Sequence, residues 1–244
     1  MRALSASELL SVWERGQAQP RVQQALLLLA AACPEISTEA LAKLSIGRRD
    51  TCLLALREWT FGSQLISLAA CPHCGERLEL AFKVADIQVI PPAEHVEVYS
   101  LNIDDYQVCF RLPNSLDLAA VTGSTDMEAA RQLLIERCLL SVEQGGEEQF
   151  AGQLPVDLVA AVGQQMGQAD PQADVQLALT CPACSHTWQA VFDIISFFWS
   201  EINAWAYHIL REVHILSSAY GWSEADILAL SPSRRQFYLE MVGR

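Results

Sequence analysis

The tetrapeptide CPHC at residues 71–74 returns, with one residue changed, as CPAC at residues 181–184. Residues 75–180 lie between the two copies, which is too long an interval for one local zinc finger. The first copy is followed by the alternating segment RLELAFKV (77–84), and the second lies between VQLALT (175–180) and TWQAVFDI (187–194). A Cys-Pro-x-Cys turn flanked by strands is typical of a zinc-ribbon hairpin, in which each turn supplies half of a tetrahedral site.

The sequence therefore predicts one site made by four thiolates and holding one structural Zn²⁺ per chain. The four ligands are Cys71, Cys74, Cys181 and Cys184. Two redox dithiols are the alternative, but a thioredoxin-type motif lies where a strand meets a helix, and strand-like residues flank both of these turns. Four thiolates leave no coordination position for water or substrate, so the metal is expected to stabilise the protein and not to catalyse. His73 and His186 are expected to face solvent.

Composition limits the classes of function. The 244 residues are 51% hydrophobic, which is enough for a substantial core, and the formal net charge of −13 opposes a nucleic-acid partner. The N-terminus shows no signal peptide, and the most apolar stretches, residues 25–33 and 194–199, are shorter than the roughly 20 residues that cross a bilayer. We expect a cytoplasmic protein that binds neither nucleic acid nor membranes.

The pattern along the chain predicts an α+β fold in five segments. Residues 1–62 are expected to form a helical N-terminal unit, and residues 63–84 the first zinc knuckle with its strand. Residues 85–174 are expected to be an inserted α+β middle domain, followed by the second knuckle hairpin at residues 175–194. Residues 195–244 predict one long helix and two short helices.

Three local features make these expectations specific. Gly47 is interpreted as a helix terminator, and Thr125 with Glu128 as the capping box of a helix that runs on through residues 139–144. In the long helix, Ile195, Ile202, Ile209 and Leu216 recur every seven residues. Such a stripe either packs within the chain or forms a seam for a partner helix or a second copy, and the oligomeric state is left open.

Two segments resemble baseplate-assembly proteins of contractile phage tails, of the T-even baseplate-hub type. They are GRRDTCLLALREWTFG (47–62) leading to CPHCGERLEL (71–80), and WAYHILREVHILSSAYGWSEADILALSPSRRQFYLEMV (205–242). The second also resembles an element of extracellular contractile injection systems. The resemblance implies a non-enzymatic assembly factor or structural component of a baseplate, which can become part of the assembled particle and whose partners are baseplate, hub or spike proteins.

By analogy with that family, the candidate partner-binding residues lie in the C-terminal segment. They are Trp205, Tyr207, His208, His214, Tyr220, Trp222, Arg234 and Arg235. The alternative function is a zinc-ribbon adaptor for nucleic acid or the transcription machinery. An enzyme is disfavoured because the sequence has no serine elbow, phosphate-binding glycine-rich loop or HExxH helix.

Overall fold

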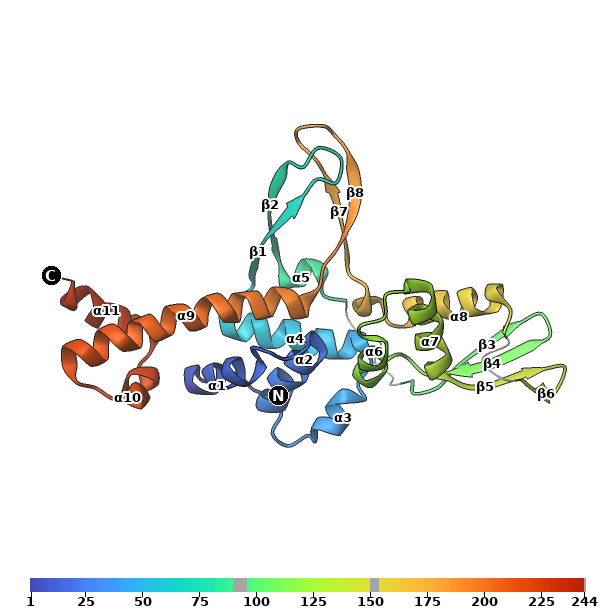
Figure 1. The fold of residues 1–244 in the computed structure, drawn as a ribbon, viewed down its shortest axis with the longest axis horizontal. Helices are drawn as coiled ribbons and strands as arrows, with labels where there is room; N and C mark the ends of the chain where they lie inside the picture. The colour runs from blue at the N-terminus through green and yellow to red at the C-terminus, as the bar shows by residue number, and fades with distance from the viewer. Residues whose placement is uncertain (90–95, 150–153, 244) are drawn as a thin grey trace. The chain divides into compact units, whose positions relative to one another are not determined.

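The computed structural model describes residues 1–89, 96–149 and 154–243 and confirms a mixed α+β fold (Figure 1). The chain forms two compact units, one made of Met1–Ile36 with Ile194–Arg244 and the other of Ser37–Asp193. We call them unit 1 and unit 2. The finer division into five segments stays a prediction.

Unit 1 is helical. Its helices are α1 (Ala6–Gly16), α2 (Arg21–Ala32), α9 (Ile194–Tyr220), α10 (Glu224–Ala229) and α11 (Pro232–Val242). Ser5 begins α1 with a capping box to Glu8, and α9 packs against the other four helices. The four residues of the seven-residue stripe on α9 are buried within this chain, so the stripe packs internally and is not a seam for another molecule.

Unit 2 contains the remaining elements. Its helices are α3 (Thr38–Ala42), α4 (Ile46–Phe61), α5 (Val84–Ile87), α6 (Ser115–Val121), α7 (Met127–Cys138), α8 (Val156–Ala169) and the 3₁₀ helix η2 (Pro171–Ala173). Its strands are β1 (Gln64–Ala70), β2 (Arg77–Lys83), β3 (Tyr99–Ile103), β4 (Tyr106–Phe110), β5 (Leu139–Gln144), β6 (Glu147–Glu148), β7 (Gln176–Thr180) and β8 (Thr187–Val191). Two antiparallel hairpins, β1–β2 and β7–β8, are separate from the four-stranded sheet β3-β4-β5-β6. That sheet packs through Val108, Phe110 and Val142 against α7 and α8.

Two local interpretations of the sequence are wrong. Gly47 does not end a helix but lies in the first turn of α4, because Ser45 caps that helix by accepting from the Arg48 N–H. The N-cap of α7 is Asp126 and not Thr125, and the helix ends at Cys138. Residues 139–144 become β5 because they pair with β4, and this long-range pairing overrides the helical propensity of the segment.

Candidate metal centre

The two Cys-Pro-x-Cys turns have the same backbone hydrogen bonds. In the first, the Cys71 N–H donates to the Glu76 carbonyl at 2.8 Å and the Gly75 N–H to the Cys71 carbonyl at 2.9 Å. In the second, the Cys181 N–H donates to the His186 carbonyl and the Ser185 N–H to the Cys181 carbonyl, both at 2.9 Å. The residue after each second cysteine is left-handed, with φ of 77° at Gly75 and 58° at Ser185. This tight turn brings the two sulfurs of each motif together.

The four sulfurs converge at the ends of the two hairpins. Cys71 Sγ lies 3.8 Å from Cys184 Sγ, Cys74 Sγ lies 3.6 Å from Cys181 Sγ, and all four atoms are within 4.8 Å of one another. Four thiolates at the usual Zn–S distance of about 2.3 Å around a tetrahedral ion are about 3.8 Å apart, whereas a disulfide requires about 2.05 Å. The described residues contain no other such group of three or more His, Cys, Asp or Glu side chains. The donor set therefore fits a tetrahedral, thiophilic ion.

The electrostatics of the cluster favour a cation. Burial opposes ionisation of Cys71, but the backbone N–H groups of Cys74 and His73 outweigh it and lower the pKa of Cys71 to about 7. The Glu76 N–H favours the Cys74 thiolate, yet hydrogen bonds with the neighbouring sulfurs and burial raise the pKa of Cys74 to about 12. Ionisation of one cysteine thus makes ionisation of its neighbours less favourable. A divalent cation removes this conflict, because it stabilises all four thiolates together.

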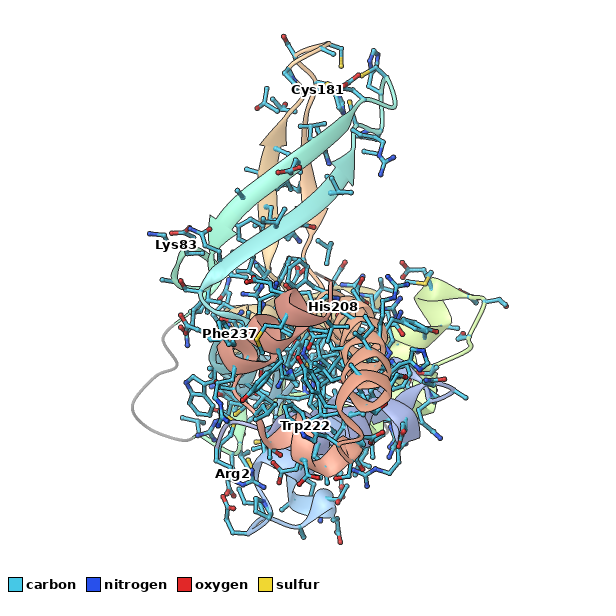
Figure 2. All side chains as sticks on the ribbon, turned by 90° about the vertical axis from the view of Figure 1, so that its left-hand side faces the viewer. Arg2, Lys83, Cys181, His208, Trp222 and Phe237 are labelled. Carbon is cyan, nitrogen blue, oxygen red and sulfur yellow. The ribbon has the colours of Figure 1, made fainter. Side chains whose placement is uncertain are left out.

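Contacts between the hairpins support the same arrangement. The rings of Phe82 and Phe192 meet edge to face with centroids 5.6 Å apart, and Leu65 is fully buried. Nearer the sulfurs, the imidazoles of His73 and His186 stack at 5.5 Å. His73 is exposed and His186 is half-buried. Figure 2 shows Cys181 at the end of the hairpins away from Lys83.

The candidate partner-binding residues are not equally accessible. Tyr207, His208, His214 and Arg234 are exposed, and Trp205 is half-buried. Tyr220 and Trp222 stack on each other with ring centroids 4.7 Å apart, and both rings contact Tyr238. Arg235 is buried, where its Nε donates to Glu212 Oε2 at 2.9 Å and its Nη1 to the Leu230 carbonyl. Tyr220, Trp222 and Arg235 thus have structural contacts that hold α10 and α11 on α9.

Reasoning from the sequence missed the part that Glu212 plays in holding α11. It is 9% exposed, with one carboxylate oxygen paired to Arg235 and the other 3.0 Å from His208 Nε2. The spacing of His208 and Glu212 by four residues was visible in the sequence. The position of Arg235, which gives Glu212 a buried partner, depends on the packing of α11.

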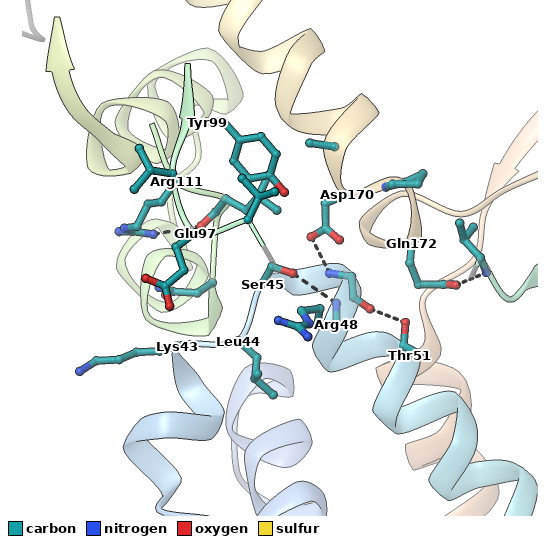
Figure 3. Close-up of a pocket in the computed structure, with 18 of the residues that line it drawn as sticks. Lys43, Leu44, Ser45, Arg48, Thr51, Glu97, Tyr99, Arg111, Asp170 and Gln172 are labelled. Atoms are coloured by element: carbon teal, nitrogen blue, oxygen red, sulfur yellow. Dashed lines mark hydrogen bonds between the residues drawn. The ribbon is translucent and has the colours of Figure 1, made fainter. Parts of the chain in front are cut away.

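Unit 2 also contains a cavity of about 560 Å³ between α4, β3 and the end of α8 (Figure 3). This volume is in the range of small-molecule sites. Three of its polar side chains are, however, already bonded to the protein: Asp170 accepts from the Gly47 N–H, Gln172 bonds Val89 and Ile87, and Arg111 bonds Asp117. We assign no ligand to it.

Among the described residues, no helix has both the length and the apolar character that crossing a membrane requires. In comparison with known proteins, a family model described as T4 bacteriophage base plate protein matches residues 5–199. The match includes all four cysteines of the cluster. Searches of curated proteins and of solved structures find no significant match.

Proposed function

This chain belongs to the family of T4 bacteriophage base plate proteins, and from that premise we propose that it is a non-enzymatic assembly factor or structural component of a contractile, phage-tail-like baseplate. The match over residues 5–199 is the observation that carries the proposal. Family membership supports a structural role and contact with other baseplate components. The finer proposal is that one structural zinc ion shapes unit 2 and that residues of the C-terminal helices contact hub or spike proteins.

The zinc would be held by Cys71, Cys74, Cys181 and Cys184. Bound there, it would join two hairpins that are distant in the sequence and so fix both ends of the segment between them. Structural zinc in small modules contributes binding free energies of about 10–16 kcal/mol, which is comparable to the whole stability of a domain. The Phe82–Phe192 contact and the His73–His186 stack alone are small in comparison.

The zinc content of purified protein tests this role. We expect about one zinc per chain after purification under reducing conditions, because the four sulfurs form one site. Cys181→Ser is expected to lose the metal and to become less soluble, since the apolar faces of the hairpins separate. Cys109→Ser is the control, because that half-buried cysteine lies on β4. Full retention of zinc by Cys181→Ser would contradict the four-thiolate site.

Partner binding is assigned to the accessible members of the C-terminal set. Tyr207 is 63% exposed and meets Trp13 edge to face, while His214 and Arg234 project from α9 and α11. Aromatic and arginine side chains are common anchors of protein interfaces. We expect Tyr207→Ala to weaken a partner complex with little loss of stability, whereas Trp222→Ala also loosens α10 and α11.

The test is an affinity pull-down from producing cells, with mass spectrometry of the soluble and sedimentable fractions. Baseplate, hub or spike proteins in the soluble fraction alone would indicate an assembly factor that leaves before completion. The same proteins together with this chain in particles would indicate a structural subunit. Recovery of neither, together with binding to nucleic acid that weakens steeply with salt, would favour the adaptor alternative.

A further inference from the structure

The backbone of β1 presents one unpaired edge. The Cys71 N–H bonds the Glu76 carbonyl and the Val84 N–H bonds the Ser63 carbonyl, and β1 pairs with β2 without a break in register. In an antiparallel pair the hydrogen-bonded positions alternate, so the odd-numbered residues of β1 face β2. The N–H and C=O groups of Gln64, Ile66, Leu68 and Ala70 therefore point away from it. Among the described residues, no third strand pairs with this edge.

This edge differs in chemistry from the other edges of the two hairpins. β1, QLISLAA, has no charge and no proline, and its Ile66 and Leu68 side chains are 62% and 61% exposed. The corresponding edge of β2 carries Arg77, Glu79 and Lys83, which are the charges that usually protect an edge strand from pairing. On the second hairpin, the β7 edge presents Gln176, Ala178 and Thr180. The β8 edge presents Thr187, Gln189 and Val191 and is also uncharged, but Val191 is its single apolar side chain. Of these four edges, β1 is the uncharged one on which two bulky apolar side chains, Ile66 and Leu68, are exposed next to each other.

We propose that β1 pairs with β1 of a second copy of this chain, so that the two hairpins form one four-stranded antiparallel sheet. A two-fold axis at Ser67 places Ile66 of each copy opposite Leu68 of the other, and Gln64 opposite Ala70. All four are residues whose backbone groups point outward, so the register satisfies the hydrogen bonds of both edges. The exposed Ile66 and Leu68 side chains then become cross-strand neighbours on the same face.

The charge distribution is compatible with self-association at this edge. Each chain has a formal charge of −13, so two copies repel each other in general. β1 brings no charge into the contact, and in the joined sheet the charged residues of β2 occupy the outer strands. Added salt should therefore favour the dimer, because it screens the general repulsion while the contact itself is uncharged. A contact made of ion pairs would show the opposite dependence.

Sedimentation velocity of the purified full chain over a range of concentrations tests the proposal. We expect a monomer–dimer equilibrium that shifts toward the dimer with salt. Leu68→Lys should raise the dissociation constant at least about tenfold, because the two-fold axis places the new charge in the contact twice. Val191→Lys is the matched control, since Val191 is 71% exposed and is the last residue of β8 on the other hairpin.

Hydrogen exchange supplies a second measurement. The amides of Ile66 and Leu68 should become protected as the dimer forms, while that of Ala178 on β7 should not. A monomer at every concentration, or a dimer that Leu68→Lys leaves unchanged, would overturn the proposal. The result is independent of the baseplate proposal, because it uses only the purified chain and leaves the zinc content and the C-terminal helices unaltered.

Discussion

Replacing Gly47 with alanine tests how α4 is fixed to the end of α8. The Gly47 N–H donates to Asp170 Oδ2 at 2.8 Å, and Asp170 is 9% exposed (Figure 3). A Cβ at residue 47 would lie 2.0 Å from Asp170 Oδ1 and 3.1 Å from the backbone N of Ala173. The carboxylate must therefore move away, and its hydrogen bond to the α4 N-terminus is lost.

The expected cost has three parts. A hydrogen bond to a charged group contributes about 1.5–3 kcal/mol. Displacing tightly packed atoms costs about 1–3 kcal/mol, and alanine in a helix returns up to about 1 kcal/mol relative to glycine. We expect Gly47→Ala to lower the free energy of unfolding by about 2–4 kcal/mol. Gly167→Ala, in α8, is the control, because no atom lies within 4 Å of its new Cβ, and it should gain about 1 kcal/mol.

Urea unfolding followed by circular dichroism measures both variants, and a double-mutant cycle identifies the cause. In an Asp170→Ala background the carboxylate clash and the hydrogen bond are both absent and the 3.1 Å approach to the Ala173 nitrogen remains, so Gly47→Ala should there cost much less than in the natural chain. If Gly47→Ala costs as much in that background as in the natural chain, Asp170 is not responsible. A Gly47→Ala variant as stable as Gly167→Ala would refute the geometric argument altogether.

Two further substitutions test packing and charge. Gly16→Ala would place a Cβ 2.1 Å from Cη2 of Trp199, so we expect a loss of about 1–3 kcal/mol, and an unchanged thermal unfolding midpoint would show that the indole moves freely. Burial raises the pKa of Asp50 to about 6 from its ordinary 3.8, against the opposing effect of Arg49, so this group makes the fold more stable as pH falls from about 6 toward 4. Asp50→Asn should remove that part of the pH dependence and raise the free energy of unfolding near neutral pH by about 1–3 kcal/mol, and urea titrations at several pH values that show no such gain would contradict it.

The cysteine cluster was predictable because its chemistry is local. Each Cys-Pro-x-Cys turn and its flanking strands can be read from about ten residues, and four thiols are the usual donors of one tetrahedral ion. The long α9 helix follows from a short-range pattern in the same way. The structure places these elements as expected.

The errors arose where distant residues decide the local structure. Residues 139–144 are acceptable in a helix, but pairing with β4 makes them a strand. Gly47 lies in the first turn of α4, where Ser45 caps the helix and Asp170, more than a hundred residues later, accepts the Gly47 N–H. Likewise, the sequence could not show that Arg235 lies inside the C-terminal helices while Arg234 is exposed, because that depends on Glu212 of α9.

The two halves of the cysteine cluster also appear at different times during synthesis. A ribosome adding about 5–20 residues per second completes CPHC on the order of 10 s before it reaches CPAC. During that interval Cys71 and Cys74 form an open dithiol, and the apolar side of the β1–β2 hairpin has no counterpart to cover it. A nascent chain would therefore depend on reduced thiols and on metal arriving late. The complete four-thiolate zinc site would therefore form only on chains whose translation has passed Cys184.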